Sequence, residues 1–328
     1  MTETGTVYLV GAGPGDPGLA TVRAMALIRS ADVLVYDALV NPVLLEDRPA
    51  HCDLVYVGKR AKVHAVPQDQ INELLVEWAR AGKRVVRLKG GDPYIFGRGG
   101  EEGEFLYDRG VPFEVVPGIT SPIAAPAYAG IPLSHRDTNS TITFITGHEK
   151  PEKLESTIPW DLLSSGKTTL AIIMGVGRLA HNMEMLRRGG MPGSMPVALV
   201  QWGTLPRQRS VVGTIDTIVE VVREAGIEAP AITIVGEVVA HRDKLNWFER
   251  RPLFGRRVVV TRAREQASGF ALRLAELGAE PIEFPTIDIR APESWEELDA
   301  ALDAVATYDW LVFTSANGVR FTLERLRA

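Results

Sequence analysis

Short runs of β-branched and other apolar residues alternate with longer amphipathic stretches along the first third of the chain. Such alternation is typical of α/β layers, in which strands pack against helices. Pro67 suits the first turn of a helix, and Ile71, Leu74 and Trp78 recur behind it at helical spacing. The pattern predicts strands at 6–10, 33–36, 54–57, 84–88 and 113–116, and helices at 19–29 and 67–81.

A second set of strand-like runs begins near Thr141. Gly130, Pro132 and several polar residues occupy the stretch before it, so we place a hinge at 129–140. The second set predicts strands at 141–146, 169–174, 197–201 and 231–235, with a helix at 216–225. The fold class is therefore α/β, and we expect one domain at 1–134 and another at 135–242.

The remaining residues form a third part of the pattern. Residues 241–255 are polar and aromatic without clear periodicity, which predicts a linker, with its bounds at 243–254. Beyond it we expect a strand at 256–262, a helix at 266–277 and a strand at 310–314. This segment, 255–328, is shorter than the ~100–150 residues usual for an independent α/β domain.

Composition narrows the function classes. The 328 residues are 45% hydrophobic and 23% charged, with a formal net charge of −5, which disfavours nucleic acid and acidic membranes as partners. Cys52 is the only cysteine, so neither an internal disulfide nor a cysteine-based zinc site is possible, and the six histidines form no metal-ligand cluster. No secretory signal and no apolar run of ~18 residues is present. We expect a reduced, cytoplasmic protein without a metal.

The first candidate motif, Gly-Ala-Gly-Pro-Gly-Asp-Pro-Gly at 11–18, directly follows a predicted strand. Its glycines allow backbone N–H groups to approach a ligand, and their spacing also satisfies a dinucleotide fingerprint. Pro14 and Pro17, however, remove two N–H groups that such a loop would aim at a pyrophosphate. A nicotinamide site and a plain tight turn stay open as alternatives at this point.

Two further motifs follow strands of the same set. Residues 87–102 combine five glycines with several charged side chains at a strand end, where open α/β sheets bind ligands. Residues 117–130 are rich in small side chains, and Thr120 and Ser121 offer hydroxyls just before a helix. The hydroxyls could equally be an ordinary N-cap, and the charged segment an ordinary loop.

Together the three segments resemble the uroporphyrinogen-III C-methyltransferase family, within the wider tetrapyrrole methylase fold. The likeness runs from about Thr6 to Arg242, and the arginine- and glycine-dense second motif is its most specific part. Other matching pieces lie at 36–37, 57–60, 64–68, 130–133, 146–148, 174–175, 203–204 and 236–238. The tail from Arg251 to Arg262, with 313–318, resembles the start of a uroporphyrinogen-III synthase; its second half is missing, so we expect no synthase activity here.

The resemblance implies two α/β domains with the active site in the cleft between them, usually in a homodimer. It also implies S-adenosylmethionine as methyl donor and S-adenosylhomocysteine as product. Asp92 could instead be a turn aspartate, and Met174 mere core filler. Carried over onto matching positions, the donor-binding residues are Pro14, Gly90, Gly91, Asp92, Ile95, Thr120, Ser121, Met174 and Gly203.

The resemblance further implies that Asp37 is a general base and Lys59 a general acid. Methyl transfer to a pyrrole carbon must be followed by loss of a proton from the ring, which a nearby carboxylate can accept. Without the resemblance, both residues would be taken for surface charges.

The implied substrate, uroporphyrinogen III, carries eight carboxylates and requires a basic cleft in an acidic chain. Arginine suits bidentate pairing with carboxylates. The candidate substrate-binding residues are Arg60, His64, Lys89, Arg98 and Arg136. The expected reaction uses two donor molecules and proceeds through precorrin-1 to precorrin-2, on the route to sirohaem or cobalamin.

Other readings remain open from the sequence. Members of the same fold methylate later corrinoids, a ribosomal RNA nucleotide or a modified histidine residue; the acidic balance disfavours RNA. A nicotinamide-dependent oxidoreductase would need an acidic ribose ligand about 20 residues after its glycine loop, and Asp37 lies near that distance. A non-catalytic scaffold in a tetrapyrrole-handling complex would bind the donor without turnover.

Overall fold

The computed structural model describes residues 4–58, 66–147, 157–261, 264–287 and 290–327. The chain divides into two compact units: Met1–Arg256 with Ala275–Glu280, and Arg257–Leu274 with Pro281–Ala328. Within the described ranges, no helix is both long and apolar enough to cross a membrane.

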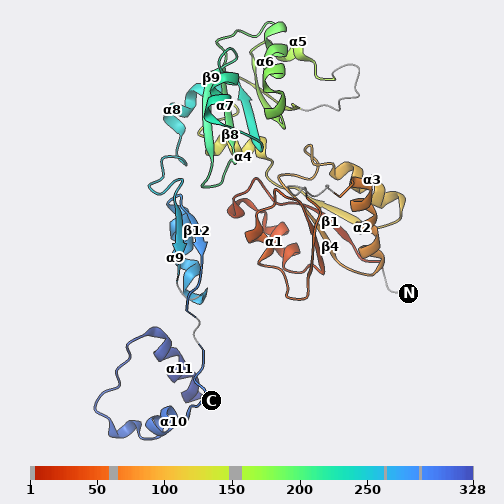
Figure 1. Ribbon diagram of the computed structural model, residues 1–328. Coiled ribbons are helices and arrows are strands. Elements are labelled where there is room, and N and C mark those ends of the chain that lie inside the picture. Colours follow the sequence, from red (N-terminus) through yellow and green to blue (C-terminus); the bar gives the residue numbers. More distant parts are fainter. Residues whose placement is uncertain (1–3, 59–65, 148–156, 262–263, 288–289, 328) are drawn as a thin grey trace. The chain divides into compact units, whose positions relative to one another are not determined.

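The first unit begins with a five-stranded parallel sheet in the order β3-β2-β4-β1-β5 (Figure 1). A parallel sheet places every strand's carboxyl end at the same edge, so the loops that follow the strands converge there. The strands are β1 (Val7–Gly11), β2 (Val33–Tyr36), β3 (Asp53–Tyr56), β4 (Val85–Lys89) and β5 (Phe113–Val116).

Helices cover both faces of this sheet (Figure 1). On one face, α1 (Val22–Ile28) packs Ala24, Leu27 and Ile28 against Val10, Leu34 and Leu88 of the strands. On the other, α2 (Gln68–Arg80) and α3 (Gly99–Asp108) pack Leu75 and Leu106 against Leu9 and Val35. Because successive strand residues alternate between faces, Arg87 and Lys89 share the α2–α3 face with Val85.

The second sheet of the first unit is mixed, in the order β6-β7-β10-β8-β9. Only β6 and β7 run parallel; the other neighbours are antiparallel. Its strands are β6 (Thr141–Thr146), β7 (Thr168–Ile173), β8 (Pro196–Gln201), β9 (Arg209–Thr214) and β10 (Ala231–Val235).

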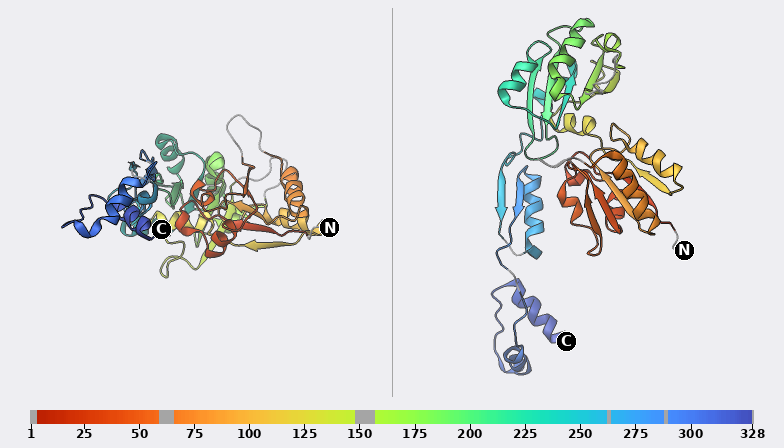
Figure 2. Two further views of the ribbon diagram at one scale, coloured as in Figure 1. Left: turned by 90° about the horizontal axis from the view of Figure 1, so that it is seen from below. Right: turned by 45° about the vertical axis from the view of Figure 1, so that its right-hand side comes forward.

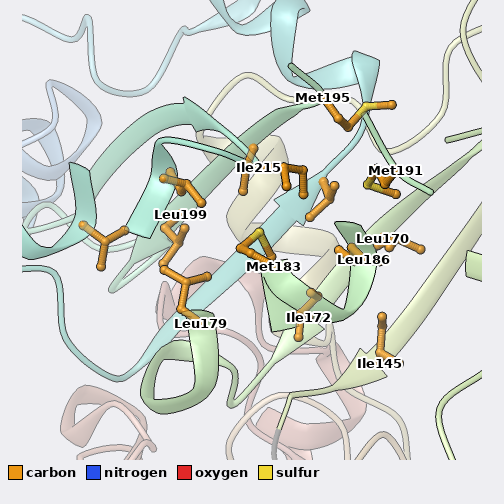
Figure 3. Packing of buried hydrophobic residues seen from close by; sticks show 14 of the residues in the cluster. Ile145, Leu170, Ile172, Leu179, Met183, Leu186, Met191, Met195, Leu199 and Ile215 are labelled. Carbon is orange, nitrogen blue, oxygen red and sulfur yellow. The ribbon is translucent and has the colours of Figure 1, made fainter. Parts of the chain in front are cut away.

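The two faces of the second sheet are covered by different parts of the chain. On one face, α5 (Trp160–Leu163), α6 (Leu179–Arg188) and α7 (Ile218–Ala225) close a core that includes Leu170, Leu186 and Leu199 (Figure 3). The other face is covered by α4 (Ser121–Tyr128), which follows β5 of the first sheet (Figure 2). Helix α4 therefore belongs by sequence to the first sheet and by packing to the second.

Residues 243–254, predicted to be a linker, pack against the end of α4. Trp247 and Phe248 lie edge-on to Tyr128, with ring centroids 5.0 and 4.8 Å away. Glu249 accepts hydrogen bonds from Gln208 (2.8 Å) and Ser210 (2.6 Å). A short helix, α8 (Arg242–Leu245), opens the segment, and the contacts tie it to the first unit.

The second unit contains a two-stranded sheet and several helices. Strands β11 (Arg257–Val260) and β12 (Glu280–Glu283) pair, α9 (Arg264–Glu276) connects them, and α10 (Glu296–Asp303) and α11 (Ala316–Arg327) follow. The predicted strand at 310–314 is wrong: these residues are irregular, and Trp310 is 83% exposed. An apolar run becomes a strand only beside a partner, and no described strand lies next to this one.

The core of the second sheet gives a stability prediction. Leu199 of β8 is fully buried among neighbours that include Leu179 and Ile215. We expect Leu199→Ala to lower the free energy of unfolding by about 2–5 kcal/mol, because burial is lost and a cavity remains. Urea denaturation followed by far-UV circular dichroism measures this. The same substitution at Leu162, which is 76% exposed, is the control; equal losses in the two variants would contradict the packing described.

Candidate functional site

The loops that follow β1, β4 and β5 meet at the edge of the first sheet without intervening side chains. Gly13 and Gly91 exchange two backbone hydrogen bonds, at 3.2 and 2.7 Å. A Cβ on Gly11 would lie 2.5 Å from Gly118 Cα, and one on Gly118 would lie 2.7 Å from Gly11 Cα. Contacts under 3.0 Å essentially never occur for real Cβ atoms. Glycine at these positions is therefore a condition of the three loops coming together.

A cavity of about 930 Å³ opens beside these loops, lined from both sheets of the first unit. The first sheet and its loops contribute residues 13–15, 38–42, 90–91, 95–97, 121–122 and 125. The second contributes residues 173–174, 176–177, 200, 202–203, 205–207 and 229–232. Most of this lining is backbone and apolar side chain, which is usual for a site that holds a small molecule.

Seven of the nine predicted donor-site positions lie in the lining of this cavity: Pro14, Gly90, Gly91, Ile95, Ser121, Met174 and Gly203. Asp92 and Thr120 do not. The Asp92 carboxylate accepts hydrogen bonds from the N–H groups of Tyr94 (2.8 Å) and Gly118 (3.0 Å), as a turn aspartate does. Thr120 is buried at the N-terminus of α4.

Backbone strain is concentrated around the cavity. Among the described residues, five that are not glycine have positive φ: Phe96 (52°), Arg98 (60°), Met174 (56°), Trp202 (50°) and Thr204 (73°). Phe96, Met174 and Trp202 line the cavity, and the other two lie within two residues of the lining. Such conformations cost about 1–3 kcal/mol each and cluster at functional sites. The strain therefore supports the cavity as the candidate site independently of any motif.

Hydrogen bonds tie the first glycine loop to the second sheet. The Asp16 N–H donates to Thr204 Oγ1 (3.0 Å), and the Tyr128 hydroxyl donates to Asp16 Oδ2 (2.7 Å). Burial, reinforced by the bond to Asp16, raises the pKa of Tyr128, so this hydroxyl remains a donor. The Thr204 N–H in turn donates to Gln208 Oε1 (2.9 Å). These contacts hold the 11–18 loop against the 202–208 loop on the other side of the cavity.

Asp37, the predicted base, directly follows β2 and precedes the lining residues 38–42, without itself being in the lining. It is part of a charged cluster. Its Oδ1 accepts a hydrogen bond from Arg87 Nη2 (2.8 Å). Arg87 Nε and Lys89 Nζ both donate to Glu102 Oε1, at 3.1 and 2.8 Å. Burial, then the neighbouring Arg87, lowers the pKa of Lys89. Lys89, predicted to bind substrate, is thus buried beside Glu102 and does not line the cavity.

The remaining predicted cations fall into two groups. Arg98 is about half-exposed and pairs with Glu101 (2.6 Å), while Arg136 is exposed; neither lines the cavity. Lys59, Arg60 and His64 lie outside the described residues. The one cation in the described lining is Arg207, whose guanidinium stacks 3.9 Å from the Trp202 ring. Arg207 belongs to none of the three glycine motifs, so no sequence pattern pointed to it.

Metal-binding residues do not gather at this site. Across the described ranges, no three or more histidine, cysteine, aspartate or glutamate side chains are placed to hold an ion.

Comparison with known proteins identifies the family. Residues 6–219 match the family described as tetrapyrrole (corrin/porphyrin) methylases. The chain belongs to this family. Residues 268–328 separately match the uroporphyrinogen-III synthase HemD family. The matches agree with the resemblance found in the sequence on both segments.

Individual methylases resemble the chain over different lengths. A uroporphyrinogen-III C-methyltransferase from Priestia megaterium is 52% identical over 235 residues, 72% of this chain and 98% of that protein. The porphyrin biosynthesis protein HemD of Ruminiclostridium josui is 43% identical over 326 residues, 99% of this chain but 64% of that protein. The chain therefore spans less than two thirds of the HemD relative.

A solved structure has the same fold. Uroporphyrin-III C-methyltransferase from Thermus thermophilus, complexed with S-adenosylhomocysteine, is 40% identical with a TM-score of 0.60. The likeness covers 72% of this chain and 99% of that one. The mixed α/β, two-domain fold expected from the sequence is confirmed.

The two hydrogen bonds that the Asp92 carboxylate accepts predict that this residue stabilises the loops. Asp92→Ala removes the acceptor for two backbone N–H groups, so we expect the free energy of unfolding to fall by about 1–3 kcal/mol. Urea denaturation measures the loss. The control is Asp108→Ala, at an exposed position on α3, where we expect a change within about 0.5 kcal/mol. A stability of Asp92→Ala equal to the wild type would show that its two hydrogen bonds do not hold the turn.

Proposed function

We propose that this chain transfers methyl groups from S-adenosylmethionine to carbon atoms of uroporphyrinogen III. The observation that carries the proposal is the cavity, at which seven predicted donor-site positions meet from three separate glycine motifs and two sheets. Membership of the tetrapyrrole methylases supports the reaction class, and the names of the relatives support the substrate and donor. The proposal extends to two successive transfers, through precorrin-1 to precorrin-2, in sirohaem or cobalamin synthesis.

The lining of the cavity fits the donor. Gly90, Gly91 and Gly203 present backbone without side chains, and Ile95 and Met174 offer apolar surface to an adenine ring. The Ser121 hydroxyl is available for a polar end of the donor. Bound there, the donor would supply an electrophilic methyl group on a sulfonium; the protein's part is to orient the pyrrole against it and exclude water.

Proton removal from the methylated ring falls to Asp37. Arg87 occupies Asp37 Oδ1 and no described residue bonds Oδ2, which leaves that oxygen for a proton. Lys59 remains the proposed acid on the strength of the resemblance. Arg98, Arg136 and Arg207 are proposed to meet substrate carboxylates, together with Arg60 and His64; Arg207 is best placed of those described, because it lines the cavity. A homodimer and a cytoplasmic location are likewise proposed from the resemblance.

The direct test of this function is anaerobic turnover of uroporphyrinogen III with S-adenosylmethionine, followed by mass spectrometry. We expect two added methyl groups and S-adenosylhomocysteine in proportion. Donor binding without any methyl transfer would contradict the proposal and favour another tetrapyrrole substrate or a scaffold.

The same assay tests the base. Asp37→Ala removes the carboxylate that follows β2 directly before the lining residues 38–42, and general-base catalysis is typically worth ~10²–10⁴-fold. We therefore expect kcat to fall by about that factor while S-adenosylhomocysteine still binds. Turnover within a few-fold of the wild type would remove Asp37 from the mechanism.

A pair of glycine variants tests where the donor binds. A Cβ on Gly203 would lie 2.9 Å from Ala125 Cα, so Gly203→Ala must displace the 202–208 loop or α4. Gly177 also lines the cavity, but a Cβ there meets nothing within 4 Å. Calorimetric titration with S-adenosylhomocysteine should show at least ~10-fold weaker binding for Gly203→Ala and nearly unchanged binding for Gly177→Ala. Wild-type affinity in both variants would place the donor elsewhere.

A further inference from the structure

We infer that Glu102 is a positioning residue for the reaction, holding Arg87 so that its guanidinium fixes the carboxylate of Asp37, directly before the cavity-lining residues 38–42. The inference rests on the proposed function, in which Asp37 takes up the proton. Neither Arg87 nor Glu102 is in the lining of the cavity, whereas Asp37, which Arg87 bonds, directly precedes the lining residues 38–42. Both residues are therefore inferred to act through Asp37.

The contacts of Arg87 determine the orientation of its guanidinium. Nε donates to Glu102 Oε1 (3.1 Å) on one side, and Nη2 donates to Asp37 Oδ1 (2.8 Å) on the other. Nη1 lies 3.5 Å from the carbonyl oxygens of both Val35 and Leu88. All three nitrogens of the Arg87 guanidinium therefore have hydrogen-bond acceptors, and the side chain is only 2% exposed. An arginine fixed in this way presents a donor to Asp37 in one direction only.

Glu102 is the group on which the cluster depends. It is fully buried on α3, and one oxygen, Oε1, accepts from Arg87, Lys89 (2.8 Å) and Gln68 (3.1 Å). Glu102 and Asp37 together balance the two cations, so the loss of Glu102 would leave Arg87 and Lys89 side by side with one counter-charge. Uncompensated buried charge is strongly unfavourable. The cations would separate or Lys89 would lose its proton, and in either case Arg87 would lose its anchor.

Stability alone does not explain such a cluster. Replacing a buried ion group with apolar side chains of similar volume is often neutral or stabilising. This one runs from the interior of the α2–α3 layer to Asp37, whose side chain is 31% exposed. The arrangement connects a rigid, buried anchor to a partly exposed carboxylate, which is what holding a base in one geometry requires.

The test is a double-mutant cycle in the full chain, with kcat, KM for uroporphyrinogen III and the Kd of S-adenosylhomocysteine measured for each variant. Glu102→Gln keeps the shape and one acceptor but removes the charge. We expect kcat to fall by up to about 10²-fold, the effect of small misplacement of a reacting group, with the Kd nearly unchanged. In the Asp37→Ala background the same change should have almost no further effect on kcat, because nothing is left to position.

Glu104→Gln, the same substitution at an exposed position of α3, is the control and should leave kcat unchanged. If Glu102→Gln does not fold, as judged by circular dichroism, Arg87→Lys makes the same test, since a lysine keeps the charge but cannot bond both carboxylates. The inference would be overturned if Glu102→Gln left kcat unchanged. It would also be overturned if Glu102→Gln lowered kcat by the same factor in the Asp37→Ala background as in the wild type. Methylation by the wild type in those cases would leave the proposed function standing, whereas absence of methylation by the wild type would remove the function itself.

Discussion

The close approach of three backbone segments, after β1, β4 and β5, is the constraint on which the rest of the site depends. Gly11, Gly91 and Gly118 come so near one another that a single methyl group on Gly11 or Gly118 would collide with backbone. Because the sheet is parallel, all three segments leave it at one edge, and their convergence produces a surface of bare peptide groups. The cavity opens beside that surface, and the parts of it that come from 13–15 and 90–91 keep their shape only while the contact exists.

The second side of the cavity is attached by a different kind of interaction. Helix α4 continues directly from the 117–120 segment yet buries Ala125 and Ala129 against the second sheet. The Asp16–Thr204 and Tyr128–Asp16 hydrogen bonds add polar links between the first glycine loop and the 202–208 loop. The packing of small side chains and these few hydrogen bonds bring the second sheet close to α4. A Cβ on Gly203 would collide with Ala125 of α4, so glycine is needed at 203 as it is in the loops of the first sheet.

The charged side chains near the site are mostly buried beneath the cavity lining and are few in the lining itself. The chain is acidic overall, and the first glycine-rich edge is nearly free of charged lining, but Arg87, Lys89 and Glu102 lie together beneath it. The ion pairs in this buried cluster act through direct contacts, and salt screens buried pairs much less than exposed charges. Arg207, stacked on Trp202, supplies the cation that the lining itself presents.

Sequence patterns predicted strands well where apolar runs were short and bounded: 33–36, 113–116, 141–146 and 231–235 agree with β2, β5, β6 and β10. They missed β9, the edge strand at 209–214, whose residues Arg-Ser-Val-Val-Gly-Thr do not alternate clearly between apolar and polar. The strand expected at 310–314 failed for lack of a partner. The glycine motifs located most of the cavity, because a close approach of two backbone segments requires glycine and is therefore visible in the sequence.

Side-chain direction could not be predicted in the same way. Lys89 and Gly90 are neighbours in sequence, yet one points into the α2–α3 layer and the other lines the cavity. Asp92 stands in the same motif but turns back to bond the Gly118 N–H. Arg207 comes from a segment with no motif at all. Which face a residue takes at a strand end depends on the alternation of the strand and on tertiary partners, and neither is visible in the motif.

The most direct test of the account is a crystal structure of this chain grown with S-adenosylhomocysteine. We expect the ligand inside the cavity, in contact with Gly90 and Gly91 of the first sheet's loops and with Met174 and Gly203 of the second's, while Arg87 still bridges Glu102 and Asp37. Ligand density outside the cavity, or contact with the loops of one sheet only, would contradict it.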